Sequence, residues 1–391
     1  MAQSEQTATI PASAILNSVN DLGRQLAQSA KTITETRDVE VEIGTAAKAE
    51  VWRSDKVVLY RYKATAERKL RTPLLLVFSL VGRYTILDLQ EDRSMVRNLL
   101  TLGVDVFVLD WGSPSLADRY LSMDDYINDY LDGAIDAIRE IDGVPSVNLL
   151  GVCEGGTFSL CYAALHREKV DNLILMVTPV DFHAKDPSEP LGHGLINLWS
   201  HNLEGRDIDE MMDVHGVLPG ELMGSIFTSM NPVRNALKYN LDLLEVADDK
   251  KKFLNFLRME KWIADRPHHP GEVAKQWIKD LYQDNKLIAN ELALDTHKVK
   301  LPNVTMPVLN IYARDDHIIP TAMTRGLGKH IGSKQYTELE LPAGHMGILA
   351  GHMGILVSGK TQHILAKGLA DWMFTQQANL SENSASQGDA D

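Results

Sequence analysis

The sequence predicts an α/β protein whose mostly parallel sheet is covered by helices on both faces. The first observation is that short apolar, β-branched segments alternate with helical patterns along the 391 residues. The second is that several apolar segments lack polar alternation, as expected for strands buried on both faces. The predicted strands are Asp55–Lys63, Leu74–Val81, Asp105–Trp111, Val147–Val152, Asn172–Val177, Val308–Ala313 and Tyr336–Leu341.

Helical patterns separate these strands. Helices are predicted over about Ser94–Leu102, Asp124–Ile141 and Lys360–Thr375, and a further one follows Cys153. The strand series stops between residues 182 and 299, where tryptophan and methionine recur among helical patterns. Long insertions between sheet strands are often functional, so we expect a helical cap over the active site. A helical flank packed on the sheet is the alternative.

The predicted organisation has a divided core and two peripheral ends. Ile15, Leu22 and Leu26 belong to a partial helical stripe near the N-terminus, and the last residues are polar. The predicted parts are an N-terminal polar segment and helix (1–37), the first part of the core (38–181), the cap insertion (182–299), the second part of the core (300–375) and a disordered tail (376–391).

Composition excludes several classes of function. The formal net charge is −14, whereas sequence-independent nucleic-acid binding needs a basic surface. No apolar stretch is long enough to predict a membrane-spanning helix. The N-terminal segment lacks a basic region followed by an apolar core, which argues against a secretory signal and favours the cytoplasm. The two cysteines, Cys153 and Cys161, also suit a reducing compartment.

A nucleophile motif lies between the strand Val147–Val152 and the next helix. Gly151-Val152-Cys153-Glu154-Gly155-Gly156 has the G-x-S-x-G spacing, with cysteine at the serine position. Such an elbow presents its nucleophile at the carboxyl edge of the sheet, where the helix N-terminus favours a thiolate. The motif predicts an α/β-hydrolase fold with Cys153 as nucleophile and the Glu154 backbone N–H as an oxyanion donor. A buried structural thiol is the alternative for Cys153, and we assign that role to Cys161.

The acid of a catalytic triad should follow the nucleophile in this fold, and the histidine should come last. Asp315 and Asp316 come directly after the strand Val308–Ala313, at the sheet edge that carries chemistry. Adjacent carboxylates are seldom both buried as charges, so one of the two is expected to face water. From position alone, both remain candidates.

Two histidines compete for the role of base, because the heptapeptide AGHMGIL occurs in tandem at Ala343–Leu349 and Ala350–Leu356. We favour His345, since three residues separate it from the strand end at Leu341 and a short tether limits its position. His352 is the alternative. The other histidines are predicted to be non-catalytic, among them His193, His201, His268, His269 and His317.

No spacing typical of a metal site or a phosphate-binding loop is present in the sequence. We therefore expect neither a metal nor a cofactor, and chemistry carried by side chains alone.

Several segments resemble the catalytic subunit of class III polyhydroxyalkanoate synthases. The elbow matches the lipase-like box of that family, and the similarity runs from about residue 40 to residue 375. The other matching segments are Leu89-Gln90-Glu91-Asp92-Arg93-Ser94, Asp110-Trp111-Gly112, Val177-Thr178-Pro179-Val180-Asp181-Phe182, Pro219-Gly220-Glu221-Leu222 and Phe256-Leu257-Arg258-Met259-Glu260-Lys261-Trp262.

The resemblance implies an acyltransferase that polymerises 3-hydroxyacyl-CoA, expected to be short-chain 3-hydroxybutyryl-CoA, and releases CoA. It implies a covalent acyl-cysteine and a triad of Cys153, Asp316 and the histidine of Gly-His-x-Gly. It also implies a growing polyester chain as ligand, a second non-catalytic subunit, homo-oligomers, and a location at cytoplasmic polyester granules.

The chain departs from the family pattern in two places. The family has Asn-Arg-Pro-Tyr where this chain has Gly82-Arg83-Tyr84-Thr85, in the loop expected to supply an oxyanion donor. That donor is a backbone N–H, here assigned to Val81, so the role survives a change of side chains. The second departure is the duplicated AGHMGIL.

Two other functions remain as alternatives. A thioesterase or polyester depolymerase of the same fold would release an acid to water, but such hydrolases usually carry serine. A non-catalytic granule subunit is the other alternative, and the duplicated heptapeptide is its best support.

Overall fold

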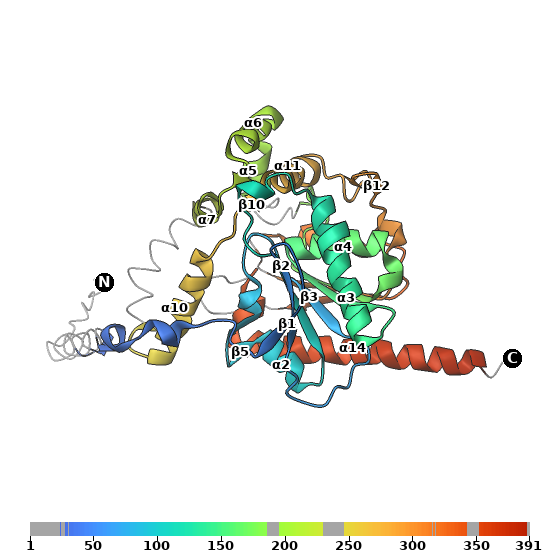
Figure 1. The fold of residues 1–391 in the computed structure, drawn as a ribbon, viewed down its shortest axis with the longest axis horizontal. Helices are drawn as coiled ribbons and strands as arrows, with labels where there is room; N and C mark the ends of the chain where they lie inside the picture. Colours follow the sequence, from blue (N-terminus) through green and yellow to red (C-terminus); the bar gives the residue numbers. More distant parts are fainter. Residues whose placement is uncertain are drawn as a thin grey trace, which may run out of the picture. The chain divides into compact units, whose positions relative to one another are not determined.

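The computed structural model describes residues 24, 28, 29, 31–185, 195–229, 246–314, 316, 318–341 and 352–388. Contacts group the chain into two compact units. The first comprises Met1–Glu42 and Asn231–Lys261, and the second comprises Ile43–Met230 and Trp262–Asp391. The second unit contains the central sheet and every candidate site residue that the structure describes (Figure 1).

An eight-stranded sheet forms the centre of the second unit. The two pairings that involve β2 are antiparallel and the other five are parallel, which confirms the mostly parallel α/β prediction. In order across the sheet, the strands are β1 (Lys48–Ser54), β2 (Val57–Tyr62), β6 (Val106–Asp110), β3 (Leu74–Val77), β7 (Val147–Val152), β8 (Val170–Met176), β13 (Val308–Ala313) and β14 (Tyr336–Leu341).

Two strands differ from the sequence prediction. The edge strand β1 was not predicted, because none of its residues is buried and its sequence lacks an apolar run. The strand β3 ends at Val77 and not at Val81. Beyond Val77 the Leu80 N–H donates to the side chain of Glu154 and not to a neighbouring strand, so the chain leaves the sheet early.

Alternate side chains of the sheet belong to two buried layers. Leu75, Phe107 and Leu149 share one continuous core with the helices on their side. Successive strand residues point to opposite faces, so Leu74 and Val106, also fully buried, belong to the other layer. The first layer is covered by η4 (Asp125–Leu131), α3 (Asp132–Asp142) and α4 (Glu154–Leu165). Two other helices, α2 (Met95–Thr101) and α14 (Gly359–Gly388), pack against each other (Figure 1).

The predicted insertion is mainly helical where it is described. A short antiparallel pair, β9 (Val217–Leu218) and β10 (His269–Pro270), joins two of its distant segments. Its helices are α5 (Leu195–His201), α6 (Gly205–His215), α7 (Gly220–Ser229), α10 (Lys250–Ala264), α11 (Gly271–Gln276) and η7 (Trp277–Gln283). The domain boundaries and the cap role stay predictions.

The C-terminal helix differs from the sequence prediction. Helix α14 continues to Gly388, although the sequence analysis expected a disordered tail from residue 376. Gln376 is buried, and the side chain of Gln377 accepts the Arg71 N–H at 2.6 Å and donates to Lys69 O at 3.3 Å. These contacts hold the helix against the rest of the chain at two residues beyond the end of its apolar pattern.

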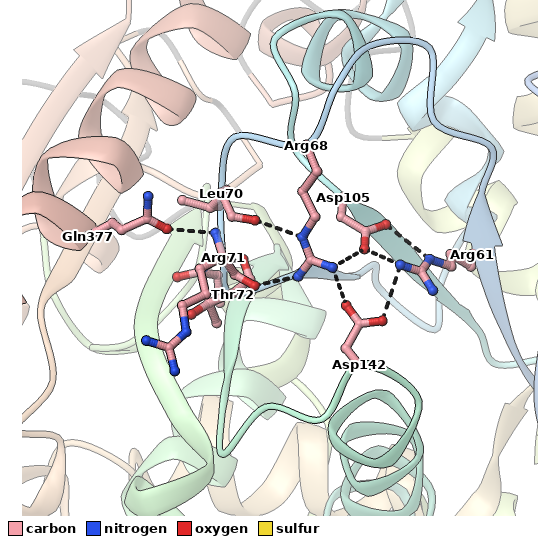
Figure 2. Close-up of polar contacts among 9 residues, drawn as sticks. Arg61, Arg68, Leu70, Arg71, Thr72, Asp105, Asp142 and Gln377 are labelled. Atoms are coloured by element: carbon pink, nitrogen blue, oxygen red, sulfur yellow. Dashed lines mark hydrogen bonds and ion pairs between the residues drawn. The ribbon is translucent and has the colours of Figure 1, made fainter.

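Two arginines and two aspartates form a network that joins β2, the start of β6 and the end of α3 (Figure 2). Asp105 lies just before β6, and Asp142 ends α3. Arg61 lies 2.5 Å from Asp105 and 3.1 Å from Asp142, while Arg68 lies 3.1 Å and 2.7 Å from the same two carboxylates. Both aspartates are nearly inaccessible, so each depends on two cations for its burial.

In the first unit, an ion pair and two hydrogen bonds connect two segments of the chain. Lys250, at the start of α10, lies 2.8 Å from Glu40, and the side chain of Arg258 donates to the backbone oxygens of Glu40 and Glu42. These contacts join η1 (Asp38–Val41) to α10 within that unit.

Candidate active site

Cys153 occupies the turn between β7 and α4 in a conformation that few residues adopt. Its φ is 55° and its ψ is −124°, outside the regions that side chains normally allow. Such a backbone persists only where its surroundings enforce it, and it is typical of functional sites. Cys153 is 8% exposed, so the strained turn holds a thiol that is nearly covered.

The glycines of the motif are required by close packing around this turn. A Cβ atom at Gly151 would lie 2.5 Å from Gly155 O, inside the start of α4. A Cβ atom at Gly155 would lie 2.5 Å from Val77 O, at the end of β3. The spacing of the glycines therefore follows from the contact of strand, turn and helix around Cys153.

Asp316 and His352 form a buried pair. The Nδ1 of His352 lies 2.7 Å from Oδ2 of Asp316, and both residues are less than a tenth exposed. The other oxygen of Asp316 accepts the backbone N–H groups of Ile318 and Ile319, at 3.0 Å and 2.9 Å. The carboxylate, which follows β13, is therefore fixed and leaves one oxygen to orient the imidazole.

The electrostatics of His352 connect this pair to the cysteine. Complete burial disfavours protonation of His352, but the charges of Asp316 and Cys153 and hydrogen bonds to both side chains outweigh burial and raise the pKa of His352 to about 10. His352 thus interacts with the predicted nucleophile and the predicted acid together. The imidazole is therefore placed to exchange a proton with the thiol of Cys153 while Asp316 holds its other side.

The structure describes one of the two candidate histidines. His345, the histidine favoured above, lies outside the described residues, as do Asp315 and His317. His352 is the histidine found at Asp316. His345 was favoured because its short link to β14 was given more weight than the short link of His352 to the last helix. In the structure His352 stands two residues before the short helix α13 (Gly354–Val357), which leads into α14.

The two predicted oxyanion donors differ in their surroundings. Glu154 is the first residue of α4, where backbone N–H groups have no acceptor within the helix, so its N–H suits the role. The Val81 N–H donates to Ser79 Oγ at 3.2 Å. Val81 can serve an oxyanion only by exchanging or sharing that long hydrogen bond.

The loop that departs from the family pattern is held by side chains of its own. The carbonyl of Arg83 accepts the indole N–H of Trp262 at 2.8 Å. The guanidinium of Arg83 donates to Gly112 O and Ser113 Oγ and forms an ion pair with Asp265 at 3.0 Å. The altered loop therefore retains a defined position next to Val81.

The side chain of Glu154 is a feature that the sequence analysis missed. It is 1% exposed, and its Oε1 lies 2.7 Å from Nε2 of His269, which was assigned no role. The signal available in the sequence was a charged residue directly after the nucleophile, where the helix start is packed against the sheet. Its partner is 115 residues away, and no local pattern reveals it.

Several other expectations concern the wider site. Cys161 is fully buried, and burial raises the pKa of its thiol to about 12, as befits a core residue. Tyr282 packs close to the site: burial, and then the charges of Cys153, Glu154 and Asp316, raise the pKa of its hydroxyl far above the usual value. His201 contacts Asn197, Ser200 and the ring of His183, His268 accepts the Gly220 N–H, and His193 lies outside the described residues.

Within the described parts of the chain, no group of three or more His, Cys, Asp or Glu side chains is arranged to hold a metal ion. Likewise, none of the described helices has the length and apolar character to cross a bilayer.

Comparisons with known proteins identify relatives over most of the chain. The family model described as alpha/beta hydrolase fold matches residues 72–351, and that of the poly-beta-hydroxybutyrate polymerase (PhaC) N-terminus matches residues 11–99. The poly(3-hydroxyalkanoate) polymerase subunit PhaC of Allochromatium vinosum is 42% identical over 90% of this chain and 95% of its own. The subunit of the same name from Synechocystis sp. is 42% identical over 86% of this chain and 87% of its own.

A solved structure has the same fold. A soluble variant of monoglyceride lipase from Saccharomyces cerevisiae, in complex with a substrate analogue, gives a TM-score of 0.52 over 87% of this chain and 98% of that chain. The two sequences are 12% identical, so this likeness bears on the fold alone.

Proposed function

Because the chain belongs to the PhaC family of poly(3-hydroxyalkanoate) polymerases, we propose that it polymerises 3-hydroxyacyl-CoA through an acyl group carried on Cys153. The family makes the chain an enzyme of polyhydroxyalkanoate synthesis, a polymerising acyltransferase. The observation that carries the proposal is the constellation of a strained Cys153 with the buried pair of His352 and Asp316.

The first step transfers the acyl group to the enzyme. The thiolate of Cys153 attacks the thioester carbonyl, and negative charge develops on the carbonyl oxygen, which the Glu154 N–H stabilises. The carbon–sulfur bond to CoA breaks as a new one to Cys153 forms. The proton on the imidazolium of His352 passes to the departing CoA sulfur, so CoA leaves as a thiol and His352 becomes neutral.

The second step extends the polymer. Neutral His352, oriented by Asp316, accepts the proton of a hydroxyl group at the end of another hydroxyacyl unit. The hydroxyl oxygen attacks the acyl-cysteine, an ester bond forms, and the bond to Cys153 breaks. The thiolate and the imidazolium are restored together. General-base assistance of this kind is typically worth about 10²–10⁴ in rate.

Cysteine suits this sequence of reactions better than serine. Attack of a thiolate on a CoA thioester exchanges one thioester for another, so the acyl group remains activated on the enzyme. A serine ester would hold the acyl group at lower energy and would slow its transfer to a hydroxyl. The cysteine therefore favours chain extension, in agreement with the family membership.

The test is a single assay with two readouts. Purified protein is given 3-hydroxybutyryl-CoA; CoA release is followed with a chromogenic thiol reagent, and the acyl product is identified by NMR. We expect CoA release together with polyester, and no release from the Cys153→Ala variant. Stoichiometric free 3-hydroxybutyrate would indicate a thioesterase, and absence of CoA release would refute the proposal. A longer-chain substrate run in parallel tests the short-chain preference.

We also propose a second, non-catalytic subunit, homo-oligomers, and action at polyester granules. The support is that the relatives are named as polymerase subunits. The isolated chain should show a lag in CoA release and should co-purify with a second protein from its host on granules. Full activity without a lag and without a partner would contradict this assignment.

A further inference from the structure

The carboxylate of Glu154 is buried directly behind the nucleophile. Burial of an ionised carboxylate is costly unless hydrogen bonds satisfy its oxygens. Three donors do so here: Ser79 Oγ and the Leu80 N–H reach Oε2 at 2.9 Å each, and His269 Nε2 reaches Oε1 at 2.7 Å. The start of α4 adds the positive end of a helix dipole. The site is thus built to hold this side chain in one place.

Hydrogen bonds connect the Glu154 side chain to the segment that carries Val81, the other candidate oxyanion donor. The hydroxyl of Ser79 donates to Glu154 and accepts the Val81 N–H. Residues 78–81 have left the sheet, so Glu154 replaces the strand hydrogen bonds that would otherwise fix them. One side chain therefore links the Glu154 backbone, which is one candidate oxyanion donor, to the segment that carries the other.

His269 completes this arrangement from the insertion. It lies in β10, which pairs with β9, and it is 2% exposed. Its Nδ1 has no hydrogen-bond partner among the described residues. The neutral tautomer with its proton on Nε2 donates to Glu154 and leaves only a lone pair unpaired, whereas a second ring proton would be a buried donor without an acceptor. Among the described residues, the hydrogen bond to Glu154 is therefore the polar contact that the ring makes.

We propose that Glu154 and His269 are positioning residues that hold Ser79–Val81 in register with Cys153, and that they join the oxyanion site to the helical insertion. Neither side chain contacts the reacting atoms in this proposal. The inference rests on the proposed acyl transfer at Cys153 and adds residues outside the triad to it.

The first test compares two substitutions of His269. Gln places its amide nitrogen near the position of Nε2, so His269→Gln keeps the donor, whereas His269→Leu removes it. We expect His269→Leu to lower kcat by about 10- to 100-fold with little change in KM, because oxyanion donors act mainly in the transition state. His269→Gln should recover most of that loss. The neighbouring His268→Leu is the matched control and should keep wild-type kcat.

The second test asks whether the pair acts as a unit. Glu154→Gln, His269→Leu and the double variant are compared per folded active site. If the two side chains act through one contact, the double variant should lose no more kcat than the worse single variant. Losses that multiply would overturn the proposal. Ser79→Ala, a small change, should reduce kcat by about 10-fold even if the Glu154 variant fails to fold.

The outcomes separate this inference from the proposed function. A wild-type protein that releases no CoA refutes the function, and the same variants are then compared by the rate at which a p-nitrophenyl ester acylates Cys153, read by the burst of p-nitrophenol. Equal kcat, or equal acylation rates, for His269→Leu and wild type would overturn the positioning role whatever the product. A lower melting temperature with unchanged kcat would also overturn it, because it would indicate a structural role only.

Discussion

The substitution His352→Asn separates the proton-transfer role of this histidine from its structural role. An asparagine amide nitrogen lies close to the position of Nδ1, so the variant can still donate to Asp316, which His352 contacts at 2.7 Å. It has no ring nitrogen to carry a proton to or from Cys153. We therefore expect kcat for CoA release to fall by about 10²–10⁴, while the melting temperature changes little.

The magnitude for stability follows from the neighbours of Asp316. In His352→Ala the carboxylate keeps the Ile318 and Ile319 N–H groups but loses its third bond. A hydrogen bond to a buried charged group is worth about 1.5–3 kcal/mol, so the alanine variant should be less stable than the asparagine variant by that amount. Urea unfolding of both variants measures the difference.

The control is the same substitution at the other copy of the heptapeptide. His345→Asn should retain kcat near the wild-type value, since His352 is the histidine at Asp316. Removal of seven residues to leave a single AGHMGIL gives the same sequence whichever copy is deleted, so only point substitutions can distinguish the two. An inactive His345→Asn beside an active His352→Asn would refute the assignment.

Three further predictions concern other parts of the molecule. Cys153→Ala should abolish CoA release in a folded protein, whereas Cys161→Ala should cost only packing; equal losses in the CoA assay would reject this distinction. Asp316→Asn should lower the unfolding free energy most below about pH 6.5, where His352 is protonated in the folded and the unfolded state. The loss should shrink as pH rises towards 10, where the raised pKa of His352 ceases to favour the folded form. An equal loss of unfolding free energy across pH 6–10 would contradict this. Arg68→Met should lower the unfolding free energy by about 1–3 kcal/mol, after allowance for the solvent exposure of the arginine. It should leave kcat per folded protein unchanged. A reduced kcat would show that the network of arginines and aspartates affects the active site.

The fold and the tight turn at Cys153 could be predicted from sequence because both depend on local patterns. The alternation of apolar strands and helices follows from a sheet that is covered by helices. Glycine is needed on both sides of Cys153 because any side chain there would collide with neighbouring backbone atoms. Asp316 also follows its strand as expected, and its backbone partners lie two and three residues away.

The remaining features depend on contacts between distant segments. Glu154 and His269 are 115 residues apart in the sequence, and no local sequence pattern at either position predicts their contact. The early end of β3 has the same origin, because the Leu80 N–H is taken by Glu154. The choice between the two histidines could not be made from local sequence for a related reason, because the two copies are identical. Of the two, the structure describes His352, which lies at Asp316.

At position 153 the backbone conformation lowers thermal stability, while the cysteine there is the proposed nucleophile. A residue in so sparsely populated a conformation costs of the order of 1–3 kcal/mol, out of the roughly 5–15 kcal/mol by which domains are usually stable. Glycine adopts this conformation without that cost. A selection for heat resistance alone would therefore enrich glycine at position 153 and yield sturdier, inert proteins. Only a screen that scores turnover would retain the cysteine.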